Sequence, residues 1–212
     1  MKTMSRMWRR ARLSVVRLLT DCRAIAATEF AVIVPIMLVL FFGTVEFSSG
    51  VAVDRKITLV SRTLSDLTSQ SSVVAITDNY LQNVFTASIA ILTPYLATPT
   101  NATISEIYVD SSRVAKIQWS KSATIGSGAT QATLGPSGHN AGDVVTVPPS
   151  LLVRQTYLIL SEVSYVYVPT IGYVMAKTGV TLSDFAYTRP RQFACLTYNN
   201  VPVLVAGACP TP

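Results

Sequence analysis

The chain has 212 residues, of which 50% are hydrophobic and only 13% are charged. About a quarter of the residues in a soluble globular domain are charged, so this composition disfavours a protein that meets water along its whole length. The length suits one ordinary domain plus a membrane-spanning segment of about 20 residues, and it argues against a large multidomain enzyme.

The net charge of +6 is concentrated in the first 23 residues. Seven Lys and Arg residues and one Asp lie there, and the remaining ten basic and ten acidic residues cancel. Lys and Arg beside an apolar helix stay on the cytoplasmic side of a membrane. We therefore interpret residues 1–24 as a basic cytoplasmic leader and expect no nucleic-acid partner, the binding of RNA or DNA by this tail being the less favoured interpretation.

A long apolar segment follows the leader. Residues 24–53 contain no Lys or Arg, and Phe30 to Val45 carries no charge at all. A helix over Phe30 to Val45 covers about 24 Å, and the addition of Ser48 to Val53 takes it beyond the ~30 Å of a hydrocarbon core. A cleavable secretory signal would be shorter. The sequence predicts one transmembrane helix over 25–53, with everything after Asp54 outside the cytoplasm.

Two acids and a proline interrupt the apolar pattern. Glu46 is interpreted as an acid at the membrane interface near Arg55 and Lys56, because an unpaired carboxylate at the bilayer centre is costly. Glu29, at the cytoplasmic end, is either another interfacial acid or a carboxylate used in recognition and subunit pairing. Pro35 cannot donate a helical hydrogen bond, which predicts a kink or a local loosening of the helix.

Residues 54–93 are expected to be helical. Apolar residues recur at a 3,4 spacing at Ile57, Val60, Leu64 and Leu67, which predicts an amphipathic extension of the anchor. Thr77 and Asp78 provide N-cap chemistry for a second helix. That helix runs from about Asn79 to Leu92. Its apolar face is formed by Tyr80, Val84, Ala87 and Ile91, with Leu81, Phe85 and Leu92 beside them.

The remainder, residues 94–191, indicates a β-rich domain. Alternating segments 103–109 and 113–119 predict a hairpin, 151–168 predicts one bent strand or two strands, and 180–187 predicts the last strand. Residues 120–142 are rich in Ser, Gly, Thr and Ala and are expected to form a mobile loop, with His139 solvated in it. The fold class is therefore α+β: a long N-terminal transmembrane helix with an amphipathic extension, a second helix and a small antiparallel sheet.

The sequence Ala26-Ala27-Thr28-Glu29-Phe30-Ala31-Val32-Ile33-Val34-Pro35, followed by Gly43-Thr44-Val45-Glu46-Phe47, resembles the amino-terminal signature of the TadE-like family. Members are pilin-like components of the tight-adherence (Tad, or Flp) pilus machinery. Residues 155–191 resemble, more loosely, the way members end, with a tyrosine-rich strand, a proline and a last strand closing on Arg.

The resemblance implies a pseudopilin or minor pilin-like protein with a pilin-like fold. Prepilin peptidase would recognise Glu29 and Phe30 and cut between Ala24 and Ile25, where Ala24 stands in place of the family's glycine. The carboxylate of Glu29 could then neutralise the new amine on Ile25 of a neighbouring subunit. Helix packing between subunits is expected to involve four residues, which are Glu29, Pro35, Gly43 and Glu46.

The resemblance also implies the location and the partners. The chain would span the bacterial inner membrane once, with a cytoplasmic N-terminus and a periplasmic or extracellular C-terminal domain, and could associate with the pilus. Expected partners are the membrane, other pilin-like subunits, the Tad pilus assembly platform and prepilin peptidase. No cofactor or metal is expected.

The cysteines fit this topology. Cys22 would leave with the leader, whereas Cys195 and Cys209 would lie outside the cytoplasm, where disulfides persist. A Cys195–Cys209 bridge would close a C-terminal loop within 192–212 and stabilise the fold by ~3 kcal/mol. Two free thiols are the alternative.

Two further functions compete with the pilus component. One is a single-pass, membrane-anchored binding or adhesion protein that does not enter a filament. The other is a membrane-tethered enzyme, which is disfavoured because we find no metal-spaced His or Cys cluster, no nucleophile elbow and no phosphate loop.

Overall fold

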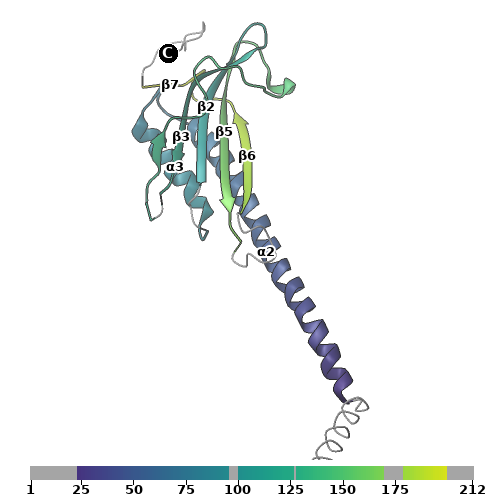
Figure 1. Ribbon diagram of the computed structural model, residues 1–212. Helices are drawn as coiled ribbons and strands as arrows, with labels where there is room; N and C mark the ends of the chain where they lie inside the picture. Colours follow the sequence, from purple (N-terminus) through teal and green to yellow (C-terminus); the bar gives the residue numbers. More distant parts are fainter. Residues whose placement is uncertain (1–22, 96–99, 127, 170–178, 200–212) are drawn as a thin grey trace, which may run out of the picture.

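A long helix projects from a head in which strands and a second helix pack together (Figure 1). The computed structural model describes residues 23–95, 100–126, 128–169 and 179–199. The predicted leader up to residue 22, the turn at 172–175 and the C-terminal loop from residue 200 onward lie outside the described residues. The α+β class expected from the sequence is confirmed.

The predicted anchor and its amphipathic extension are one continuous helix, α2 (Arg23–Ser69). The helix runs without interruption through Pro35. Its first half projects away from the head, whereas its second half lies against the sheet (Figure 1). The apolar face expected from the 3,4 spacing is confirmed, because Ile57, Val60 and Leu64 are fully buried and Leu67 packs against the same core.

The second helix, α3 (Asp78–Ile89), begins where the cap chemistry predicted. The hydroxyl oxygen of Thr77 accepts a hydrogen bond from the backbone N–H of Tyr80. A short 3-10 helix, η1 (Ala90–Leu92), follows. Most of the predicted apolar face is confirmed, because Leu81, Val84, Phe85 and Leu92 are buried and Tyr80 and Ile91 pack against the core. Ala87 is the exception, since it is exposed.

Five antiparallel strands form the main sheet in the order β4-β3-β2-β5-β6. They are β2 (Thr100–Val109), β3 (Ala115–Thr124), β4 (Thr133–Gly135), β5 (Thr156–Tyr167) and β6 (Val180–Thr188). The predicted hairpin is β2–β3, and its turn is closed by the carboxylate of Asp110, which accepts from the backbone N–H groups of Ser112 and Val114. A 3-10 turn, η2 (Pro149–Leu151), precedes the single long strand β5.

The sheet has two differently covered faces. Helices α2 and α3 pack on one face, where alternate residues of the central strands, such as Ala102, Ile104 and Val163, join the main core. On the other face, a smaller apolar cluster around Ile107 and Leu158 is covered by the segment at 145–152. The rest of that second face is lined mostly by polar side chains.

The structure corrects the predicted loop over 120–142. Strand β3 continues to Thr124, and β4 pairs with it at the sheet edge. Between the two strands Ala132 is fully buried, and its backbone is held by the side chains of Gln82 and Thr86 from α3. The segment is held by bonds from side chains of α3 to its backbone. Its sparse apolar content therefore gave no indication that it is ordered.

The last described residues return to the helical side of the head. Strand β7 (Thr197–Tyr198) pairs in parallel with β1 (Ala75–Ile76), which lies between α2 and α3. The ring of Tyr198 stacks on Trp119 of β3, with 5.8 Å between the centroids. The C-terminal segment up to residue 199 is therefore part of the folded head.

Candidate functional site: the exposed half of α2 and its junction with the head

The projecting half of α2 exposes apolar side chains all round. From Ile25 to Val45 the helix is about 31 Å long, which matches a hydrocarbon core. Within the described residues, one helix is long and apolar enough to cross a membrane, and it is this one. The most exposed large side chains there are Phe30, Val32, Met37, Leu40 and Phe41. A helix that is apolar on every side needs an apolar surrounding, either lipid or other helices.

The predicted processing residues lie at the start of this half. The structure brings Ile25, Glu29 and Phe30 onto the first turns of α2, and all three are exposed. No hydrogen bond or ion pair to Glu29 is present among the described side chains. The bond between Ala24 and Ile25 lies within the helix, although the side chain of Ala24 is not described. Pro35 is also exposed, and Gly43 is half-buried.

Glu46 lies where the apolar half of α2 ends, but it is not the solvated acid beside Arg55 and Lys56 that the sequence suggested. Its side chain is 4% exposed, and its carboxylate accepts a hydrogen bond of 3.1 Å from the hydroxyl of Tyr167 at the end of β5. Lys56, the expected neighbour, instead donates to the backbone carbonyls of Ile91 and Thr93. The predicted role of Glu46 in packing between subunits stays a prediction, with its carboxylate hydrogen-bonded to the head of its own chain.

The junction has a helical spacing that the sequence analysis missed. Glu46, Gly50, Val53 and Ile57 recur at intervals of four, three and four residues, so they share one face of α2. A Cβ on Gly50 would lie 3.7 Å from the ring of Tyr167, which is ordinary van der Waals contact. The buried face therefore begins at Glu46, eight residues before the predicted amphipathic extension. This spacing, with a glycine among polar residues, was the feature of the sequence that could have indicated where the buried face of α2 begins.

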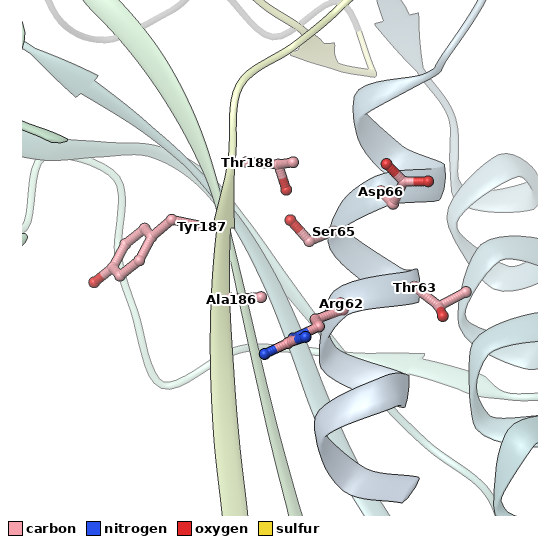
Figure 2. A pocket seen from close by; sticks show the side chains of 7 residues that line it. All are labelled: Arg62, Thr63, Ser65, Asp66, Ala186, Tyr187 and Thr188. Atoms are coloured by element: carbon pink, nitrogen blue, oxygen red, sulfur yellow. The ribbon is translucent and has the colours of Figure 1, made fainter. Parts of the chain in front are cut away.

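A cleft separates α2 from the edge strand β6 higher in the head (Figure 2). It has a volume of about 350 Å³ and is lined by Arg62, Thr63, Ser65, Asp66, Ala186, Tyr187 and Thr188. The hydroxyls of Ser65 and Thr188 point toward one another across it, while the Tyr187 ring points away from the helix (Figure 2). Asp66 is paired with Arg191 at 2.5 Å. The cleft holds no arrangement of nucleophile and base.

One fully buried carboxyl lies under the C-terminal segment. Glu106 of β2 accepts hydrogen bonds from the indole N–H of Trp119 at 3.0 Å and from the backbone N–H of Leu196 at 2.6 Å. Burial raises the pKa of Glu106 to about 8, although both hydrogen bonds act in the opposite direction. The indole N–H also reaches the carbonyl of Leu196, at 2.8 Å. This group connects β2, β3 and the C-terminal segment.

Only one cysteine of the predicted disulfide, Cys195, lies within the described residues. Cys195 is buried, packs beside Tyr108 and Tyr157, and is disulfide-bonded. Cys209, like Cys22, lies outside the described residues. The Cys195–Cys209 pairing therefore stays a prediction.

His139 is not solvated in a loop as expected. Its Nε2 lies 2.7 Å from Oε2 of Glu162 on β5, and its side chain is about one-third exposed. Among the residues that the structure describes, no group of three or more His, Cys, Asp or Glu side chains could hold a metal ion.

These features define a class of protein: an α+β head carried on one long helix whose free half can cross a membrane. Residues 24–63 match the model of the family described as TadE-like protein, which confirms the amino-terminal part of the resemblance drawn from the sequence. The looser resemblance of residues 155–191 stays a prediction. The matched residues belong to α2, and the family is one of structural, pilus-associated components. The search of curated proteins gave no match, and neither did the search of solved structures.

Proposed function

We propose that the chain is a pseudopilin or minor pilin-like component of a Tad-type pilus, which acts by packing its apolar helix against those of other subunits in the inner membrane. The observation that carries this proposal is the division of α2. One half is built into the head, and the other half is apolar on all sides with a single carboxylate, Glu29, near its start.

Glu29 would favour one axial register among the packed helices of neighbouring subunits. A carboxylate in an apolar surrounding is costly unless it is paired. Cleavage between Ala24 and Ile25 would create an amine four residues before Glu29, and the amine of a neighbouring subunit is a suitable partner. Subunits shifted along the helix axis would leave both charges unpaired and would be disfavoured.

The junction between α2 and the head would pass the axial alignment of the helices on to the heads outside the membrane. Because Glu46 and Gly50 pack against Tyr167, the head is held on α2 at the point where the free half ends. Axial alignment of the helices would therefore also align the heads.

Cleavage is the step that tests the proposal. The protein is extracted from the membrane of its native host, and its intact mass and N-terminal sequence are measured. We expect the chain to begin at Ile25, and to retain its leader when the host's prepilin peptidase is deleted. An Ala24→Gly variant, which restores the family residue, should be cleaved at the same bond.

A retained leader in the wild-type host would contradict this proposal. The chain would then be better described as a single-pass, membrane-anchored binding or adhesion protein outside a filament.

A further inference from the structure

The face of the sheet that points away from α2 carries two aligned rows of side chains, which are polar except for Phe185. Cross-strand partners in an antiparallel sheet point to the same face. Thr103 of β2, Glu162 of β5 and Phe185 of β6 are such partners, and form one row across three strands. The neighbouring row contains Asn101, Ser164 and Ser183.

These rows and a loop that reaches over them together form a hollow. Residues 137–140 follow β4 and reach over the sheet, where the imidazole of His139 meets Glu162 at 2.7 Å. The start of the loop is tied to β3, since the hydroxyl of Ser122 donates to the carbonyl of Pro136. The hollow has a volume of about 370 Å³, within the range of small-ligand sites.

The groups in the hollow combine three properties. The hydroxyls of Thr103, Ser164 and Ser183 can each donate and accept, and the amide of Asn101 does both. The carboxylate of Glu162 accepts strongly. Phe185 is 60% exposed on the edge strand directly opposite Glu162, and its ring meets that of Tyr187 edge-on, with 5.7 Å between the centroids.

This combination matches a sugar better than other small ligands. Each sugar hydroxyl both donates and accepts, and one face of a pyranose ring is formed by C–H groups that can stack on an aromatic ring. An anion is disfavoured by the carboxylate of Glu162. A metal ion is disfavoured because the described residues offer no cluster of three ligating side chains.

We propose that this hollow binds a neutral carbohydrate, with Glu162 accepting from the sugar hydroxyls and Phe185 stacking on the ring. His139 is a positioning residue, because its hydrogen bond to Oε2 orients the carboxylate across the hollow. The site goes beyond the pilus role proposed above and does not depend on leader cleavage.

The test uses the full chain in lipid nanodiscs, which avoid detergents with sugar headgroups. Glucose, galactose, mannose and N-acetylglucosamine are titrated at millimolar concentrations, and binding is followed by saturation-transfer difference NMR. The ring signals of ¹³C-labelled phenylalanine provide a second readout without any substitution. We expect at least one sugar to bind and to shift the Phe185 ring signals.

Matched variants assign the binding to the hollow. Glu162→Gln should weaken it about tenfold or more, because it removes charge-assisted hydrogen bonds. Phe185→Ala should abolish the saturation-transfer signal. Ser183→Ala should weaken binding, whereas Thr181→Ala, on the same strand and face but outside the hollow, should not.

Three outcomes would overturn the proposal. The first is the absence of binding for every sugar together with unshifted Phe185 signals. The second is equal binding by the wild type and the Glu162→Gln variant. The third is binding of a lysine-rich peptide, but of no sugar, with the same dependence on Glu162 and Phe185, which would assign the hollow to a basic protein partner.

Discussion

The hydroxyl of Tyr167 donates a hydrogen bond to the carboxylate of Glu46, joining the end of β5 to α2 across 121 positions of the chain. The bond lies at the boundary between the half of α2 that projects and the half that is buried in the head. It therefore sets where the rigid head begins along the helix.

Replacement of Tyr167 tests this junction. In Tyr167→Phe the buried carboxylate of Glu46 loses one donor, so we expect the free energy of unfolding of the head to fall by about 1–3 kcal/mol. The change is measured by urea unfolding in detergent micelles. Tyr187→Phe is the control, since the Tyr187 hydroxyl makes only a long 3.4 Å bond. Equal effects of the two substitutions would argue against a special role for the junction.

Gly50 provides a test by size. Gly50→Ala should be tolerated or should stabilise α2 by about 0.5–1 kcal/mol, because a Cβ fits beside Tyr167 and alanine favours helix. Gly50→Leu should displace the Tyr167 ring and lower the unfolding midpoint. If Gly50→Leu unfolds at the same urea concentration as the wild type, the ring is not packed against α2 in solution.

Glu106 predicts that the head loses stability as the pH rises. Its pKa is about 8 in the folded chain against a usual value of 4.5, so between these values the folded state retains a proton that the unfolded state has released. Below pH 4.5 Glu106 makes its full contribution to the free energy of unfolding. This contribution declines by about 1.4 kcal/mol per pH unit until the pH passes 8.

The comparison with Glu106→Gln isolates this contribution. The variant keeps an oxygen that can accept from Leu196 but has no proton to lose, so we expect its stability to depend less on pH between 5 and 8. Urea unfolding of both proteins across that range gives the difference. Parallel pH profiles would mean that Glu106 is ionised in the folded head.

Glu29→Gln tests the pairing proposed in the membrane. The variant should fold, but even the molecules that begin at Ile25 should fail to associate with other pilin-like subunits, because a neutral amide does not neutralise an amine. Co-purification after crosslinking in the native host measures the association. Glu46→Gln is the matched control, since that carboxylate faces its own head. Normal assembly of Glu29→Gln would reduce Glu29 to an interfacial acid.

The C-terminal bridge is tested by thiol counting. Intact mass after alkylation, with and without reduction, should show Cys195 and Cys209 protected together in the mature protein. We expect Cys209→Ala to lower the stability by roughly 3 kcal/mol, if the bridge closes the predicted loop of about 15 residues. Alkylation of Cys209 without reduction would exclude the pairing.

Local patterns predicted the elements of this fold well. The apolar spacing of Ile57, Val60 and Leu64 is a property of one helix, and the Thr77 cap depends on neighbours three residues away. Both are therefore visible in a short stretch of sequence. The strand β4 was harder to predict, because it depends on pairing with a distant segment.

The candidate site was predicted in part. The exposed apolar half of α2, with Glu29 and Phe30 at its start, was expected from charge and hydropathy. Glu46 was misplaced because a carboxylate next to an apolar run suggests an interface, and nothing local indicates Tyr167. His139 was misplaced for a similar reason, since its partner Glu162 is 23 residues away on another strand.

The sequence by itself determined the long helix, its apolar half, the α+β class and the family resemblance, because all of these depend on periodicity, composition and a contiguous motif. Tertiary structure alone decided which polar groups are buried and what each one meets. Glu46 with Tyr167, Glu106 with Trp119 and His139 with Glu162 are pairs formed only when the sheet closes. The burial of a carboxylate is not determined by its neighbours in the sequence, because its environment is formed by residues that folding brings to it.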